Sequence, residues 1–222
     1  MNLHYTLSII PQIVAYLPVT LAMAVVAMGL AIVFGALLTI VYNSRRMKWF
    51  AQFYLLIFRG FPTLVLLFIA YYGIPQMLHV NDTTPAWITA TLCLAFKEAA
   101  YLEEIFRSGI VSVDPGQIEA GRSLGLSRSL VYRQIVIPQA LRAIVPPTGS
   151  TFIALLKETS LAFSIGVTEL FGAGKMIASE NFKYFDVYLV VGILYVIVIY
   201  FYTLLQSAFE KRLNRIYENA EG

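Results

Sequence analysis

Charged side chains occur inside otherwise apolar stretches of this 222-residue chain. Lys157 and Glu158 are adjacent, and Thr159 and Ser160 follow them directly. The others of this kind are Arg59, Lys97, Glu98, Glu103 and Glu104. If these stretches span a bilayer, each ionised residue at its centre costs at least about 2.5 to 3.5 kcal/mol, so the charges must face protein or water. They are therefore candidates for a polar site or for a structural network between helices.

The sequence contains few residues that are suited to catalysis. The two histidines, His4 and His79, lie outside the apolar stretches, so we expect neither a histidine-assisted serine site nor an H-E-x-x-H zinc site. The single cysteine, Cys93, has no partner for an intrachain disulfide and is expected to be a small buried apolar side chain. The sequence predicts no catalytic residue and no metal ligand, and hence no enzyme.

The stretch Gly172 to Lys175 contains a Gly-Lys pair of the kind found in phosphate-binding loops. That motif also needs Gly six residues before the Lys and Ser or Thr directly after it. Glu169 and Met176 occupy these positions. We therefore interpret the stretch as an exposed turn and expect this chain to bind no nucleotide or other cofactor itself.

The composition indicates a membrane protein. Hydrophobic residues make up 59% of the chain and charged residues only 13%, against roughly 25% charged in soluble domains. The formal net charge is +3, but the basic residues lie between apolar runs and form no nucleic-acid-binding patch. The main solvent of this chain is predicted to be lipid, with no nucleic-acid partner.

Five stretches have the length of about 20 residues that a helix needs to cross a bilayer. They are residues 18–42, 53–73, 85–106, 143–167 and 187–209. The predicted fold class is an all-α integral membrane protein, a single domain over residues 1–222 with five transmembrane helices and a long loop between the third and fourth.

The distribution of basic residues predicts the orientation. The links after the first and third spans and the tail after the fifth contain eleven Lys and Arg residues, whereas the other links contain only Lys175 and Lys183. Because positive charges concentrate on the cytoplasmic side, we expect the N-terminus outside and the C-terminus in the cytoplasm.

The loop over residues 116–138 has a specific pattern. Residues 118–124 and 127–136 are predicted to be short helices, with Gly125 supplying the turn between them and Ser127 capping the second. An element of this kind is a candidate docking site for a partner, although an amphipathic linker would have a similar composition.

In this loop the chain resembles the membrane subunits of ATP-binding-cassette importers. Their loop pattern is E-A-A, three residues, G, nine residues, I, one residue, L-P. The matching residues here are Glu119-Ala120-Gly121, Gly125, Ile135 and Ile137-Pro138, with Gly121 and Ile137 as the two departures. Three flanking segments look like the polar amino acid permease branch: residues 59–62, 98–107 and 157–161. Phe61 stands where that branch usually has Thr.

The resemblance implies a bacterial cytoplasmic (inner) membrane protein that works in a complex. A second permease subunit, the same or a similar chain, would complete the pore. Two cytoplasmic ATP-binding subunits would use ATP and Mg²⁺, and an extracytoplasmic amino-acid-binding protein would deliver the substrate. Residues of the loop would couple the pore to the ATPases: Glu119, Ala120, Gly121, Arg122, Leu124, Gly125 and Ser127.

Within the membrane, helix geometry places Arg59 and Glu98 at similar depth, so we predict a structural ion pair between the second and third spans. Glu103 and Arg107, four residues apart, are expected to pair locally. Tyr101 shares a helical face with Lys97 and Glu104.

Lys157 and Glu158, with Thr159 and Ser160, are the predicted substrate-path residues. They follow an expected break in the fourth span at residues 146–150. Adjacent opposite charges match the carboxylate and ammonium of an amino acid. A structural network across the dimer, in which Thr159, Ser160 or Lys97 satisfies the charges, explains the same residues, and the sequence leaves both interpretations open.

A self-sufficient secondary carrier or channel is the competing function. It would explain the polar residues inside the membrane, but it would give the loop at 116–138 no role, and five spans are an odd number for an inverted repeat. We therefore expect an amino acid importer subunit.

Overall fold

The computed structural model describes residues 3–79 and 84–221, and side chains from residue 5 to residue 215 within them. The expectation for His4 therefore lies outside the described side chains. The described residues form helices and connecting loops without a strand. In chain order the elements are α1 (Leu3–Val14), α2 (Leu17–Asn43), α3 (Lys48–Gly60), α4 (Thr63–Phe68), η1 (Ile69–Gly73), α5 (Ile74–Leu78), α6 (Ala86–Val111), α7 (Pro115–Ser123), α8 (Arg128–Val131), η2 (Tyr132–Val136), α9 (Ile137–Glu158), η3 (Thr159–Ile165), α10 (Leu170–Asn181) and α11 (Tyr184–Glu221).

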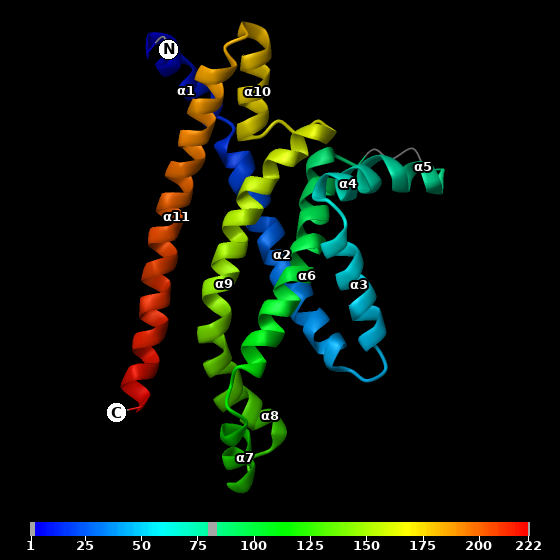
Figure 1. Cartoon of the computed structure of the whole chain (residues 1–222), viewed down its shortest axis with the longest axis vertical. Coiled ribbons are helices and arrows are strands. Elements are labelled where there is room, and N and C mark those ends of the chain that lie inside the picture. Colours follow the sequence, from blue (N-terminus) through cyan, green and yellow to red (C-terminus); the bar gives the residue numbers. More distant parts are fainter. Residues whose placement is uncertain (1–2, 80–83, 222) are drawn as a thin grey trace.

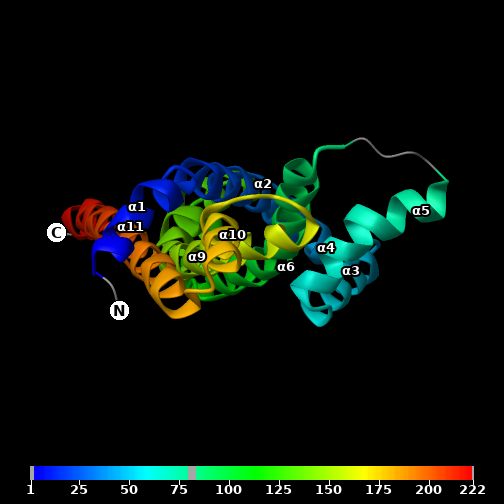
Figure 2. The same ribbon diagram turned by 90° about the horizontal axis from the view of Figure 1, so that it is seen from above.

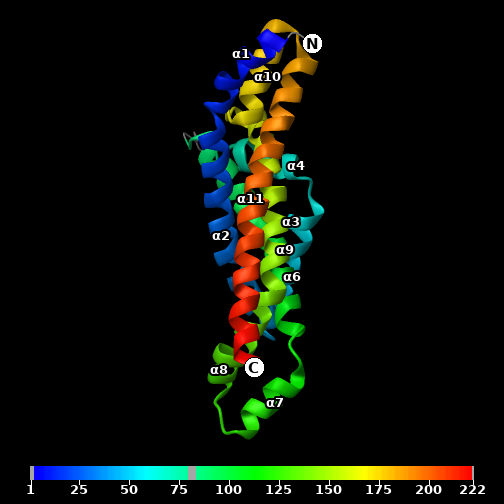
Figure 3. The same ribbon diagram turned by 90° about the vertical axis from the view of Figure 1, so that its left-hand side faces the viewer.

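The long helices α2, α6, α9 and α11 run along the length of the molecule (Figure 1). Helices α1 and α10 lie at one end, and α7 and α8 extend beyond the long helices at the other (Figures 1 and 3). Seen along the length of the molecule, α4 and α5 extend sideways, away from α11 (Figure 2). The segment that contains α7 and α8, which we call the loop element, thus protrudes at one end of a bundle.

The bundle centre is formed by close contact between α2 and α6. Small residues line the buried face of α2, including Ala24, Ala27, Ala31 and Gly35. A Cβ atom built on Gly35 would lie 2.9 Å from the Cβ of Leu102 on α6. Small side chains allow membrane helices to approach closely, so this pair forms a rigid base for the charged residues of α6.

The predicted second span is not one straight helix. Helix α3 ends at Gly60, and the following helical segment, Thr63–Leu78, is bent by 106° relative to it. Phe61 has extended backbone angles, as expected for a residue that precedes a proline, and Pro62 offers no N–H to continue the helix. The expectation of a continuous helix over 53–73 was therefore wrong.

The predicted fourth span, in contrast, is more regular than the sequence predicted. Helix α9 is continuous through Pro146 and Pro147, so the expected break at 146–150 is absent. The side-chain amide of Gln206 on α11 donates a hydrogen bond to the Pro146 carbonyl at 3.2 Å, and Thr151 donates to the Pro147 carbonyl at 3.0 Å. The first of these bonds ties α9 to α11 beside the prolines, whereas the carbonyls that lose their helical N–H partners are those four residues earlier, at 142 and 143.

Two helices, α2 and α11, are each long and apolar enough to cross a membrane alone. Two bent pairs of helical segments could each form one further span, which gives up to four: Lys48–Gly60 with Thr63–Leu78, and Arg128–Ile165 with Leu170–Asn181. Helix α6 is 26 residues long but contains the charged residues between Lys97 and Arg107. The fold is all-helical, and the count of five spans stays a prediction.

The Gly172 to Lys175 stretch was wrongly interpreted as an exposed turn. It lies inside α10, and Gly172, Ala173 and Gly174 are buried. A Cβ atom on Gly174 would collide with the Val191 side chain of α11. These glycines allow two helices to pack closely and do not form a loop.

Candidate functional site

A network of ionised side chains lies inside the bundle between α6, the end of α9 and the start of α4. The Lys97 ammonium donates to Glu98 Oε1 at 2.9 Å and to both carboxylate oxygens of Glu158 at 2.7 Å. Thr63 Oγ1 donates to Glu158 Oε2 at 3.5 Å. One cation therefore joins two carboxylates from helices that are far apart in the sequence.

The side chains of this network differ in how deeply they are buried. The side chains of Lys97 and Glu98 are 9% and 3% exposed, whereas that of Glu158 is 28% exposed. Glu158 is thus the member of the network that remains open to its surroundings. The buried pair fixes the position of Lys97, and Lys97 in turn orients Glu158.

Lys157 does not join its neighbour in the network. Its side chain is exposed and has no ion pair among the described residues, although Glu158 beside it points inward. Thr159 and Ser160 donate their hydroxyls to the carbonyls of Leu156 and Lys157, at 2.8 and 2.7 Å. Of the partners that the sequence allowed for a structural network, the structure therefore shows Lys97 bound to Glu158.

The predicted pair between Arg59 and Glu98 is absent. Arg59 Nη1 lies 2.6 Å from Glu104 Oε2, and both side chains are about two-fifths exposed, at 39% and 42%. The depth estimate assumed a straight helix through Arg59, but α3 ends one residue later and Lys97 already satisfies Glu98. The ring of Tyr101 contacts two cations: its centre lies 5.4 Å from the Arg59 guanidinium carbon and 5.0 Å from the Lys97 ammonium.

The predicted local pair of Glu103 and Arg107 is confirmed, with Arg107 Nε 3.3 Å from Glu103 Oε1. The Glu103 side chain is fully buried, and the Arg107 guanidinium also lies over the ring of Tyr42 at 5.0 Å. This pair holds the end of α6 against α2, away from Glu158.

The loop element consists of α7, a turn and α8, which continues through η2 into α9. Gly125 has φ of +80°, and the N–H groups of Gly125 and Leu126 donate to the carbonyls of Arg122 and Gly121 at 3.0 and 3.2 Å. This is a Schellman motif, in which glycine takes the left-handed position that other residues adopt only at a cost. Ser127 Oγ accepts from Leu130 N at 3.4 Å, which confirms the predicted cap.

Packing explains one departure of the loop from the family pattern. Gly121 is buried, and a Cβ atom there would lie 2.9 Å from Ile135 Cδ1 and 3.1 Å from Val131 Cγ2. Glycine at this position therefore lets α7 pack closely on α8 and η2. Glu119, Arg122 and Ser127 stay exposed, and Leu124 at the tip is 81% exposed.

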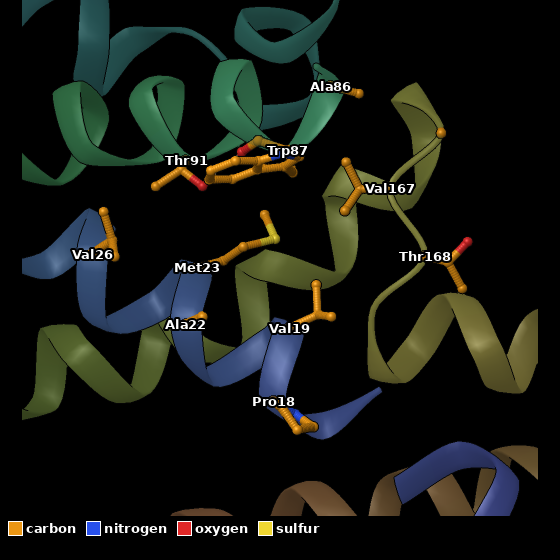
Figure 4. Close-up of a pocket in the computed structure, with 11 residues that line it drawn as sticks. Pro18, Val19, Ala22, Met23, Val26, Ala86, Trp87, Thr91, Val167 and Thr168 are labelled. Atoms are coloured by element: carbon orange, nitrogen blue, oxygen red, sulfur yellow. The ribbon is translucent and has the colours of Figure 1, made fainter. Parts of the chain in front are cut away.

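An apolar cavity of about 630 Å³ lies at the other end of the bundle, between the starts of α2 and α6 and the segment 166–168 (Figure 4). Met23, Trp87 and Val167 line it, and the hydroxyl of Thr91 donates to the Trp87 carbonyl at 2.7 Å. None of the described residues that line this cavity is charged. It therefore offers nothing for the two charges of an amino acid.

Glu169 is a buried structural residue that the sequence analysis overlooked. Its carboxylate accepts from the backbone N–H groups of Phe171 and Gly172, at 3.1 and 2.7 Å, and thereby caps α10. Tyr195 on α11 and Thr20 on α2 donate to the same carboxylate at 3.0 and 3.4 Å. A Glu directly before a helix was the available signal, but Glu is not among the usual capping residues.

Comparisons with known proteins agree with this architecture. Residues 31–215 match the family described as "Binding-protein-dependent transport system inner membrane component". The "Probable amino-acid permease protein YxeN" of Bacillus subtilis is 45% identical over 216 residues, which is 96% of each chain. The "L-cystine transport system permease protein TcyL" of the same organism is 38% identical over 93% of this chain and 89% of its own length.

Solved structures of ABC transporters contain chains with a similar fold. A chain from the "Crystal structure of an amino acid ABC transporter with histidines" has a TM-score of 0.87 and 32% identity, and covers 96% of this chain and 99% of that one. A chain from the MetNI methionine ABC transporter has a TM-score of 0.76 at 19% identity over 93% and 98% of the two chains, which shows a shared fold. The chain therefore belongs to the family of binding-protein-dependent inner-membrane transport components, within its branch of polar amino acid ABC importer permeases.

Proposed function

We propose that the chain is the transmembrane subunit of an ATP-driven importer for a polar amino acid. Two copies, or this chain and a similar one, form the translocation path. Two cytoplasmic subunits use ATP and Mg²⁺, an extracytoplasmic protein delivers the amino acid, and this chain binds no cofactor. The N-terminus lies outside and the C-terminus in the cytoplasm, so the basic links flank the protruding loop on the ATPase side.

The observation that carries this proposal is the form of the α7–α8 element. It extends past the long helices (Figure 1), presents the exposed tip residue Leu124, and is packed against the start of α9 through Val113, Val131 and Val136. A surface that is exposed at its tip and rigid at its base suits a partner that must move the helices above it.

Helix α9 connects this element to the ion network. It follows η2 directly and ends at Glu158, so its 22 residues span about 33 Å. A displacement of α8 by a closing ATPase would therefore be transmitted along one helix to the carboxylate that Lys97 holds. We propose this as the coupling path, with Glu119, Ala120, Gly121, Arg122, Leu124, Gly125 and Ser127 at its ATPase end.

Cross-linking tests the contact with the ATPase. In a Cys93→Ala background, Leu124→Cys labelled with a photoreactive maleimide should cross-link to the ATP-binding subunit encoded beside this chain, in the co-purified complex. Leu78→Cys is the matched control, because Leu78 is 59% exposed but lies on α5, far from the loop. Equal cross-linking from both positions, or none from Leu124→Cys in an intact complex, would contradict the proposed contact.

We further propose that Lys157 and Glu158 face the substrate path. Lys157 presents a cation without an ion-pair partner among the described residues, which suits the carboxylate of an amino acid. Glu158 retains an exposed fraction of 28% and suits the ammonium, with Thr159 and Ser160 shaping the turn that follows.

Lys157→Ala is expected to reduce uptake by roughly ten- to a hundredfold while substrate-stimulated ATPase activity remains, because a charge-assisted hydrogen bond contributes about 1.5 to 3 kcal/mol. Lys157→Arg, which keeps the positive charge, should retain more uptake. Failure of the Lys157→Ala protein to assemble with its partners would instead assign Lys157 to a structural contact between subunits.

A further inference from the structure

A groove of about 1030 Å³ opens where the loop element meets the bundle. Four parts of the chain line it: the end of α2, the end of α6, the residues Val113, Pro115 and Ile118, and the segment from α8 to the start of α9. We call it the interfacial groove. Its residues take no part in the ion network around Lys97.

The lining of the groove is amphiphilic. Three of its apolar residues, Ile40, Val111 and Ile137, are 69%, 73% and 48% exposed. Its polar residues include Ser44, Arg128 and Ser129. A groove with an apolar wall and a set of hydrogen-bond donors matches a ligand that has a hydrocarbon part and a polar headgroup.

The charge of the groove is positive. Arg128 has no ion pair among the described residues, and its guanidinium lies 5.7 Å from the ring centre of Tyr132, which also lines the groove. An adjoining cavity of about 330 Å³ shares Ile118, Arg128 and Tyr132 with the groove and adds Arg122. Among the described residues no acidic side chain lines either cavity, although Asp114 stands between the lining residues Val113 and Pro115.

The surrounding residues place the groove at the boundary between lipid and water. Trp49, which follows Lys48 at the start of α3, is 67% exposed, and exposed tryptophans are typical of the headgroup level. Arg45 and Arg46 follow the groove residue Ser44 directly in the sequence and are exposed. Basic pockets between helices at this depth bind the headgroups of anionic lipids.

We propose that the interfacial groove binds an anionic phospholipid of the adjacent leaflet. Arg128 contacts the phosphate, the hydroxyls of Ser44 and Ser129 donate hydrogen bonds to headgroup oxygens, and an acyl chain packs along Ile40, Val111 and Ile137. The bound lipid fills the space between α2 and the loop element. This proposal requires neither a transported substrate nor an ATPase contact.

Quenching by brominated lipids tests the proposal on the full chain reconstituted in vesicles. The reporter protein contains Trp49→Phe, Trp87→Phe and Tyr132→Trp, which leaves one indole, in the groove and beneath Arg128. Its fluorescence is measured with brominated phosphatidylglycerol in phosphatidylcholine vesicles and with the bromine on the other lipid. About 1 kcal/mol per basic residue near a charged headgroup corresponds to an expected preference of roughly fivefold for phosphatidylglycerol.

Three variants of the reporter isolate the role of the charge. Arg128→Gln should bring the preference close to one, and Arg128→Lys should retain most of it. Arg133→Gln is the matched control, since Arg133 is exposed nearby but does not line the groove, and it should change nothing. Arg128 is itself exposed, and circular dichroism of each variant checks that the helices remain folded.

Equal quenching by the two brominated lipids in the reporter with Arg128 intact would overturn the proposal. The same conclusion would follow if Arg133→Gln removed the preference as fully as Arg128→Gln. Loss of the preference on adding inorganic phosphate at constant ionic strength would show a general anion site in place of a lipid site.

Discussion

Gly125→Val is expected to lower ATP-driven uptake about tenfold while membrane insertion and the amount of assembled complex stay unchanged. Gly125 has φ of +80° in the turn between α7 and α8. A left-handed conformation costs an ordinary residue about 1 to 2 kcal/mol, and more when the side chain is β-branched. Valine would therefore open the Schellman motif and displace the tip without disturbing the bundle.

The matched control for this prediction is Gly125→Asn. Asparagine adopts the left-handed region more readily than valine, and a Cβ atom at this position meets no atom within 4 Å. Uptake should follow the order Gly, Asn, Val, as measured in vesicles that contain equal amounts of complex. Normal uptake by the Gly125→Val protein would contradict the proposed coupling role of the turn.

Lys97→Met is expected to destabilise the protein severely. The change leaves the carboxylate of Glu98, only 3% exposed, without the ammonium that now lies 2.9 Å away, and it also removes the ion pair of Glu158. Removing one partner of a buried ion pair costs about 3 to 5 kcal/mol. We expect a marked loss of folded protein and a lower melting temperature in detergent.

Two comparisons make this prediction specific. Adding Glu98→Gln and Glu158→Gln to Lys97→Met removes the unpaired charges and should recover part of the thermal stability, although not transport. Lys211→Met is the control, because Lys211 is exposed on α11 and has no ion pair among the described residues. If the Lys97→Met protein melts like the unmodified one, the network does not hold the helices together.

The loop element was predictable from the sequence because its signals are local. A glycine between two helical patterns and a serine at the start of the second indicate a turn and a cap wherever the chain lies in space. The structure places Gly125 and Ser127 in these roles. The charged residues of the network were also recognisable, since ionised groups inside apolar stretches are rare.

The pairing of these charges was not predictable, because it depends on the path of the helices in three dimensions. Helix geometry predicted a pair of Arg59 with Glu98, but α3 ends at Gly60 and the chain then turns by 106°. Pro62 marks the break in the sequence, whereas the angle is set by packing against α6 and η3. Thr63, which follows that break and donates to Glu158, was overlooked for the same reason.

Glycine was ambiguous for a related reason. At Gly125 it forms a turn with positive φ, whereas Gly121 and Gly174 are helical and allow close contact with Ile135 and Val191. The local sequence does not distinguish these two uses. The wrong interpretation of Gly172 to Lys175 as a turn follows from that ambiguity.

Uptake by reconstituted protein decides whether this chain is a subunit of an ATP-driven importer. The chain is purified with its encoded neighbours, incorporated into liposomes, and supplied with labelled polar amino acids. An importer subunit should give uptake of an amino acid that requires internal ATP, the ATP-binding subunits and the extracytoplasmic binding protein together. Uptake of the same amino acid by this chain alone, without ATP, would instead identify a secondary carrier or channel.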